Sequence, residues 1–171
     1  ARGQIAAAQV LLSRGADVKS RTLPDEQGNS ASVLEMALKV DDVKKRIDMA
    51  SLLIEGGAGI SIPAEDGTTM LHAACRMSPG PEAPRLVGML IEKGAEVNAR
   101  TQRGETPLVY AAGSANMPAA KFLISNGAEV NSRDADGQTP LMAALFALDG
   151  GWVSGAVEMI AFLRQQGGRS D

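Results

Sequence analysis

The sequence of 171 residues has few aromatic side chains, a single cysteine and no long apolar run. Aromatic residues make up 3% of the chain and hydrophobic residues 44%, so any core has to be built from Ala, Leu, Ile, Val and Met. One cysteine excludes an internal disulfide framework and fits a reducing compartment, from which we expect an intracellular protein, cytoplasmic or nuclear. No stretch approaches the roughly 18 apolar residues of a membrane-spanning helix, so we expect no membrane insertion.

Positive charge and metal-ligating residues are scarce as well. The 17 Lys and Arg residues are outnumbered by 20 Asp and Glu residues, which gives a formal charge of -3. Nucleic-acid-binding domains are usually clearly basic, so no nucleic-acid partner is expected. One histidine and one cysteine do not supply the about four ligands of a zinc site, or a Cys–His pair with an orienting third group. The glycine-rich stretch at 56–61 lacks the lysine of a phosphate-binding loop. We therefore expect no metal, no cofactor and no enzymatic activity.

What the sequence does contain is a recurring motif. ETPLVYAA at 105–112 returns as TTMLHAAC at 68–75 and as QTPLMAAL at 138–145, with a less similar copy, SVLEMAL, at 32–38. Its leucine stands at 34, 71, 108 and 141, in steps of 37, 37 and 33 residues. Thr106 is suited to cap a helix and Pro107 to its first position. A second apolar helix is expected to end at a glycine, as at Gly94 and Gly127.

A period near ~33 residues with a T-P-L-H-x-A pattern is typical of ankyrin repeats, and the chain resembles that family over nearly its whole length. The resemblance implies an all-α solenoid of stacked helix-turn-helix units with hairpin-like arms, all in one domain. We expect a partial leading unit at 1–21, an irregular unit at 22–62, and further units at 63–99, 100–132 and 133–171. Segments that lengthen the turn between two helices are expected at 40–46, 78–84 and 148–155.

The two ends of the stack are predicted to differ. The leading unit lacks its first helix and a polar outer face, which stacked repeats normally carry at an end, so we expect more repeats or another domain upstream. At the other end, the pair Leu163-Arg164 stands where earlier units have two apolar residues, which predicts a cap. Trp152 lies in the last inter-helix segment, where it is either an interface anchor or, as we slightly favour, a lid over the final helices.

The resemblance also implies where a partner binds. In ankyrin-like folds the arm tips and the exposed side of each first helix line a concave surface. Carried onto this chain, the partner-binding residues are Arg21, Glu65, Asp66, Arg76, Met77, Arg100, Gln102, Arg103, Glu105, Tyr110, Arg133, Asp136, Gln138, Phe146 and Trp152. Its arginines could form a basic stripe that binds carboxylates of an acidic ligand. The arm carboxylates partly cancel that charge, so ordinary exposed arm residues remain the alternative.

Other motif residues have structural roles in the resemblance. His72 is expected to hydrogen-bond backbone between neighbouring turns, and Cys75 to occupy an alanine-like core position. Asn98 and Asn131 each follow a leucine by eight residues, a pattern that asparaginyl hydroxylases act on in ankyrin-like proteins. Hydrogen bonding across the arm is the simpler role for both. The few aromatic residues disfavour a cage for methylated lysine.

Two functions are consistent with these sequence features. The first is a non-catalytic interaction module that binds a protein or peptide on the concave surface. The second is an intramolecular regulatory or scaffold segment that packs against another domain of the same longer chain. An enzyme ranks third, because no catalytic site is visible in the sequence.

Overall fold

The computed structural model describes residues 10, 43–57, 60, 63–77, 83–149 and 155–170. Several predictions fall outside these residues. They concern Arg21, Trp152, the leading unit apart from Val10, and the long arm and first helix of the unit at 22–62.

All regular structure in the described residues is helical, which confirms the all-α prediction. The seven helices are α3 (Val43–Glu55), α4 (Met70–Cys75), α5 (Ala83–Glu92), α6 (Pro107–Gly113), α7 (Met117–Ser125), α8 (Pro140–Asp149) and α9 (Ala156–Gln165).

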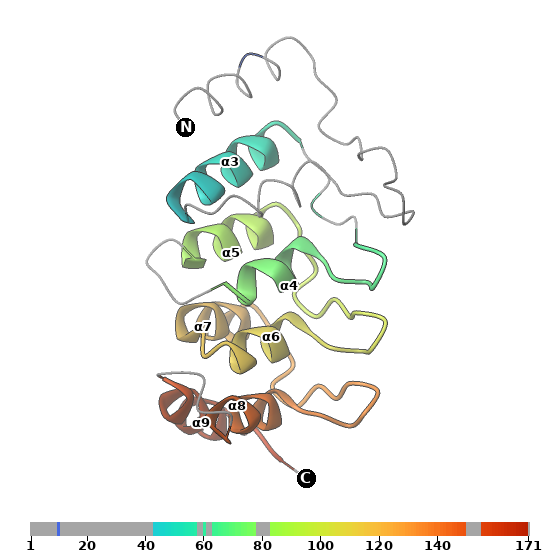
Figure 1. Cartoon of the computed structure of the whole chain (residues 1–171), viewed down its shortest axis with the longest axis vertical. Coiled ribbons are helices and arrows are strands. Elements are labelled where there is room, and N and C mark those ends of the chain that lie inside the picture. The colour runs from blue at the N-terminus through green and yellow to red at the C-terminus, as the bar shows by residue number, and fades with distance from the viewer. Residues whose placement is uncertain are drawn as a thin grey trace.

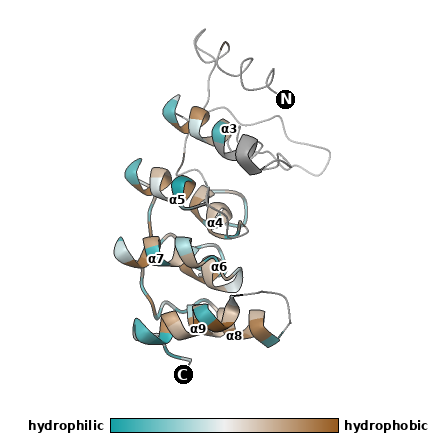
Figure 2. Ribbon diagram, turned by 90° about the vertical axis from the view of Figure 1, so that its left-hand side faces the viewer, coloured by the Kyte–Doolittle hydropathy of each residue, from teal (hydrophilic) through white to brown (hydrophobic). Residues whose placement is uncertain are grey.

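The helices stack in layers along one axis (Figure 1). The first helices α4, α6 and α8 pack in succession, and so do the second helices α3, α5 and α7. α9 packs on α8 and completes the last layer. Each first helix is preceded by an arm that projects to one side of the stack, at 63–69, 100–106 and 133–139 (Figure 1). Figure 2 shows that α3, α5 and α9 each end in hydrophilic residues, whereas apolar residues lie along the helices. This arrangement is the predicted solenoid.

The helices begin and end at the predicted residues. Thr106 stands at the cap position of α6 with extended backbone angles (φ -102, ψ 162), but its side chain makes no cap hydrogen bond and contacts Ser132 Oγ at 3.0 Å instead. Pro107 occupies the first turn, where its missing N–H leaves no bond unmade. Gly127 follows α7 with φ 87, a left-handed conformation that glycine adopts without steric strain. The start of α7 was not foreseen in full: Asn116 caps it, because its side-chain Oδ1 accepts a hydrogen bond from Ala119 N at 3.2 Å.

Three helices extend into segments predicted as turns. α3 begins at Val43, inside the expected turn at 40–46, and α8 runs to Asp149, inside the segment at 148–155. α5 begins at Ala83 and contains Pro84. The expectation that 78–84 lies wholly in the turn between two helices is therefore wrong for its end, which includes Pro84. The physical reason is that the first turn of a helix has no backbone partner for the N–H that proline lacks.

The core lies between the layers and is built from leucines and alanines. The motif leucines Leu71, Leu108 and Leu141 are at most 2% exposed, and each lies in its own layer. Fully buried alanines let the helices approach closely: Ala50, Ala74, Ala111, Ala112, Ala119, Ala120 and Ala144. Phe122 fills the space beside Gly88, because a Cβ added to that glycine would lie 3.2 Å from the Phe122 ring. A close-packed core is thus reached with almost no aromatic residues.

Candidate functional site: the arms and first helices

The three described arms are hairpins with the same backbone bonding. The N–H of one residue donates to the carbonyl four positions later: Ala64 to Thr68 at 2.8 Å, Thr101 to Glu105 at 3.0 Å and Asp134 to Gln138 at 3.1 Å. Consecutive arms are also joined, because Gln102 N donates to Asp66 O and Ala135 N to Arg103 O, both at 2.8 Å. The arms therefore form one ordered edge. We call this edge, together with Arg76 and those residues of α4, α6 and α8 that are not buried, the arm–helix surface.

Arm arginines are bonded within the chain. Arg100 donates through Nη1 to the carbonyls of Gly104 at 3.1 Å and Arg133 at 2.8 Å. Its Nη2 lies 3.3 Å from a carboxylate oxygen of Glu129. Arg103 pairs with Asp136 at 2.7 Å, and that carboxylate raises the pKa of Arg103. Because these guanidinium groups already bond to carbonyls and carboxylates of the chain, they are less available to a ligand than the expected basic stripe requires.

The two carboxylates of the first of these arms, Glu65 and Asp66, form no ion pair in the described part of the chain. Glu65 is exposed. Asp66 Oδ1 accepts a hydrogen bond from Thr68 N at 2.8 Å, and its bonds to Thr68 lower the pKa of Asp66. On the second arm, Glu105 Oε2 accepts from Thr101 Oγ1 at 3.2 Å and from the Tyr110 hydroxyl at 3.4 Å, and its charge interacts with Arg103. The first arm is therefore anionic, whereas the second carries charges of both signs.

His72 is fully buried and links two layers, as predicted. Its Nδ1 accepts a hydrogen bond from Thr69 N at 3.1 Å, so its Nε2 carries the proton and donates to Glu105 O at 3.1 Å. The Tyr110 ring contacts the imidazole edge-on, with the ring centroids 5.1 Å apart. Burial lowers the pKa of His72, so the imidazole is neutral at pH 7. Both ring nitrogens of His72 are therefore occupied by structural hydrogen bonds.

Cys75 is also fully buried, and burial raises the pKa of its thiol. A buried, protonated thiol is a poor nucleophile. Asn116 joins the layer of Cys75 to the next one, because its Nδ2 donates to Cys75 O at 3.2 Å and to Met77 O at 3.0 Å. Within the described residues, no group of three His, Cys, Asp or Glu side chains could hold a metal ion.

The predicted binding residues differ in exposure. Met77 is 9% exposed and belongs to the core, so the expectation that its side chain lies on the surface is wrong. Its backbone carbonyl accepts a hydrogen bond from Asn116 Nδ2 at 3.0 Å, and its side chain packs in the hydrophobic core. Glu105, Tyr110 and Gln138 are half-buried, and the amide oxygen of Gln138 is buried without a hydrogen bond. The others in the described residues are exposed: Glu65, Asp66, Arg76, Arg100, Gln102, Arg103, Arg133, Asp136 and Phe146.

The two arm asparagines hydrogen-bond across the arms, in agreement with the simpler prediction. Asn98 donates to Gly127 O at 3.0 Å and accepts from Glu129 N at 2.9 Å. Asn131 makes the same pair of bonds to Gly167 O and Arg169 N. The role of Asn116 was not predicted, although a polar residue directly before a Met-Pro helix start was a signal for a cap.

Known proteins match this chain through the same repeats. Residues 81–169 match the family model described as ankyrin repeats (3 copies). The chain is 34% identical over 113 residues to ankyrin repeat and SOCS box protein 16 of Homo sapiens, covering 66% of this chain and 22% of that protein. It is 33% identical over 87 residues to the 2-5A-dependent ribonuclease of Homo sapiens, covering 50% of this chain and 11% of that protein. The ADP-ribosylation factor GTPase-activating protein AGD2 of Arabidopsis thaliana is 32% identical over 83 residues, which are 48% of this chain and 10% of that protein.

Proposed function

Because the chain belongs to the ankyrin repeat family, we propose that it binds a polypeptide partner, without catalysis, on the arm–helix surface. Ankyrin repeats are generally protein–protein interaction modules and are typically non-catalytic. The observation that carries the proposal for this surface is the bonded row of arms. A surface held in place by hydrogen bonds between arms loses little conformational entropy when a ligand binds. An intracellular location is part of the same proposal; none of the described helices could cross a membrane.

The predicted preference for an acidic ligand now depends on one arginine, Arg76. Arg100 and Arg103 are engaged within the chain, Arg133 donates to Gly137 O at 3.3 Å, and Arg21 lies outside the described residues. Arg76 is exposed, and its side chain makes no hydrogen bond or ion pair in the described part of the chain. We propose that any preference for a carboxylate in the ligand comes from Arg76.

A second function remains a proposal for a separate reason. The chain covers between 10% and 22% of the length of the relatives it matches, so in those proteins the similar repeats are part of much longer chains. An intramolecular role, in which the repeats pack against another domain of a longer chain, would use the same surface. The division into units at 22–62, 63–99, 100–132 and 133–171 is kept as a proposal as well.

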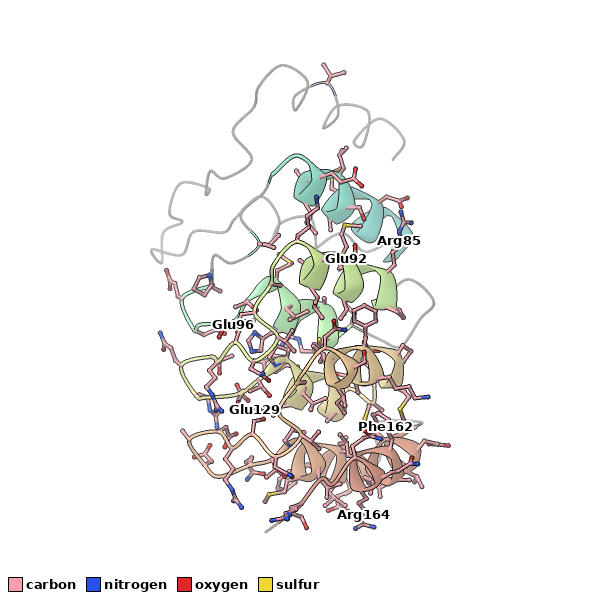
Figure 3. All side chains as sticks on the ribbon, turned by 180° about the vertical axis from the view of Figure 1, so that it is seen from behind. Arg85, Glu92, Glu96, Glu129, Phe162 and Arg164 are labelled. Atoms are coloured by element: carbon pink, nitrogen blue, oxygen red, sulfur yellow. The ribbon has the colours of Figure 1, made fainter. Side chains whose placement is uncertain are left out.

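The proposal can be tested with selected peptides. A random dodecapeptide library would be displayed and selected on the immobilised chain, and affinities of fluorescein-labelled peptides would be measured by anisotropy. We expect Gly113→Gln, which adds a side chain to the arm–helix surface, to weaken binding. The control is Arg85→Glu on α5, which Figure 3 shows at the edge of the stack opposite the arms. Equal binding by the wild-type chain and by folded Gly113→Gln would exclude this surface.

A further inference from the structure

One line of positions on the arm–helix surface joins three layers. Arg76, Gly113 and Phe146 each stand five residues after a motif leucine, at the end of α4, at the end of α6 and in α8. They therefore occupy equivalent places in successive layers and follow the stack axis. The line contains a charged residue, then a residue with no side chain, then an aromatic residue.

The aromatic end of this line is open to solvent. Phe146 is 61% exposed, although most phenylalanines in folded proteins are largely buried. It is one of only 3 phenylalanines in a chain whose core is otherwise aliphatic. An exposed aromatic side chain of this kind is a common anchor in protein interfaces, because burying it removes a large apolar area from water.

The middle of the line is unfilled. A Cβ added at Gly113 would meet only one atom within 4 Å, the Cβ of Ala143 at 4.0 Å. Packing therefore does not require glycine at this position, the last residue of α6. The structure accommodates a larger residue at Gly113, so its absence leaves room for a ligand side chain beside Phe146.

The charges at and around Arg76 determine which ligand group can bind at the other end of this line. Arg76 is the exposed cation described above, with five N–H donors in a geometry that matches a carboxylate. The neighbouring arm at 63–69 carries the unpaired carboxylates of Glu65 and Asp66, which repel further negative charge. A ligand with one carboxylate at Arg76 matches this pattern, whereas a run of acidic residues that also reaches this arm does not.

We infer that the ligand is an extended polypeptide segment with one acidic residue at Arg76 and one large apolar residue against Phe146, two layers away, which the open position at Gly113 leaves accessible. This inference rests on the proposed function. Packed helices lie about 8–10 Å apart, so positions two layers apart are separated by roughly 16–20 Å. An extended chain rises about 3.3 Å per residue, which spaces the acidic and apolar residues by about five or six positions.

The selected dodecapeptides provide the test. Peptides that bind the chain are expected to share Asp or Glu about five or six residues from Phe, Leu, Ile or Trp. Arg76→Glu should weaken their binding about tenfold, and Lys in place of the peptide's acidic residue should restore it. Phe146→Ser should weaken binding, whereas Val157→Ser, at an equally exposed apolar position (61%) on α9, should not. Thermal unfolding of each variant establishes that it is folded.

The outcomes separate this inference from the proposed function. Peptides that Gly113→Gln excludes, but that lack the acidic residue or bind Arg76→Glu unchanged, overturn the inference and leave the proposed surface in place. Peptides that bind Gly113→Gln, Arg76→Glu and Phe146→Ser as tightly as the wild-type chain contradict both the inference and the proposed function. A failure to recover any binding peptide also contradicts both. Restoration by the charge exchange supports the inference, because a merely structural role of Arg76 would not depend on the charge of the peptide.

Discussion

Two neighbouring junctions in the stack are held by different kinds of bond. The α4/α6 junction joins α4, α5 and the arm at 63–69 to α6, α7 and the arm at 100–106. It contains buried neutral hydrogen bonds from His72 to Glu105 O and from Asn116 to Cys75 O and Met77 O. The α6/α8 junction joins α6, α7 and the arm at 100–106 to α8, α9 and the arm at 133–139. It carries two exposed ion pairs, Arg100–Glu129 and Arg103–Asp136, and one buried hydroxyl pair.

Charge and stability are therefore distributed unevenly in the stack. A buried hydrogen bond that loses one partner leaves the other without water, which costs about 1–3 kcal/mol. Exposed ion pairs contribute little, because water and salt screen them. The α4/α6 junction should therefore depend on its neutral side chains, while the ion pairs of the α6/α8 junction mainly neutralise arginines that would otherwise attract acidic ligands.

The largest effect should come from the closest approach of two arms. A Cβ at Gly67 would lie 2.7 Å from Gln102 N, whereas at the equivalent Gly137 the nearest atom would be Arg133 Nη1 at 4.0 Å. Both glycines have positive φ, so alanine costs roughly 1–2 kcal/mol at either position. We expect Gly67→Ala to lose roughly 2–5 kcal/mol in total, since the backbone clash adds to this strain. Urea unfolding measures both variants, and equal losses would contradict the difference between the arms.

Asn116→Ala should have the next largest effect. The side chain is fully buried and makes three hydrogen bonds, so its removal leaves two backbone carbonyls and one N–H unpaired. We expect a loss of roughly 2–4 kcal/mol in the free energy of unfolding. Asn126→Ala, at an exposed position next to α7, is the matched control and should lie within about 0.5 kcal/mol of wild type. A loss no larger than that of the control would show that Asn116 does not hold the junction.

Acid should weaken the α4/α6 junction through His72. Burial lowers the pKa of His72 in the folded state, so as the pH falls below 6.5 the unfolded chain binds a proton more readily than the folded chain does. Stability is present above pH 6.5 and falls as the pH falls, by at most about 1.4 kcal/mol per pH unit for one proton. Urea unfolding below pH 6.5 should show the slope in wild type and not in His72→Gln. A slope of equal size in His72→Gln would assign it to other groups.

The ion pair between Arg103 and Asp136 should have the smallest effect on stability. Both side chains are more than half exposed, at 70% and 58%. A double-mutant cycle with Arg103→Ala and Asp136→Ala, measured by thermal unfolding, should show no resolvable coupling at physiological salt. A clear coupling that persists in 1 M salt would contradict the comparison of the two junctions.

The fold was predictable because its determinants are local and repeated. Thr106 with Pro107 starts a helix, Gly127 ends one, and Leu71, Leu108 and Leu141 mark where the layers pack. Helix starts were less predictable: a polar segment such as 43–46 joins α3, and Pro84 joins α5, because the first turn of a helix tolerates residues that its interior does not.

The candidate surface was predicted only in outline. Exposure of the arm residues followed from the repeat, but the pairing of Arg100 and Arg103 depends on the register of arms about 33 residues apart. Met77 was wrongly predicted to be exposed for the same reason, because its packing in the core depends on residues distant in the sequence. The open positions at Arg76, Gly113 and Phe146 became evident only once the partners of each side chain were known.

Hydroxyl-radical footprinting of the chain, with and without a bound peptide from the selection, would locate the ligand without relying on any substitution. We predict that binding slows the oxidation of Tyr110 and Phe146 on the arm–helix surface and leaves Phe162, on α9, unchanged. Unchanged oxidation of Tyr110 and Phe146 together with slower oxidation of Phe162 would place the ligand on the second helices and contradict binding at the arm–helix surface.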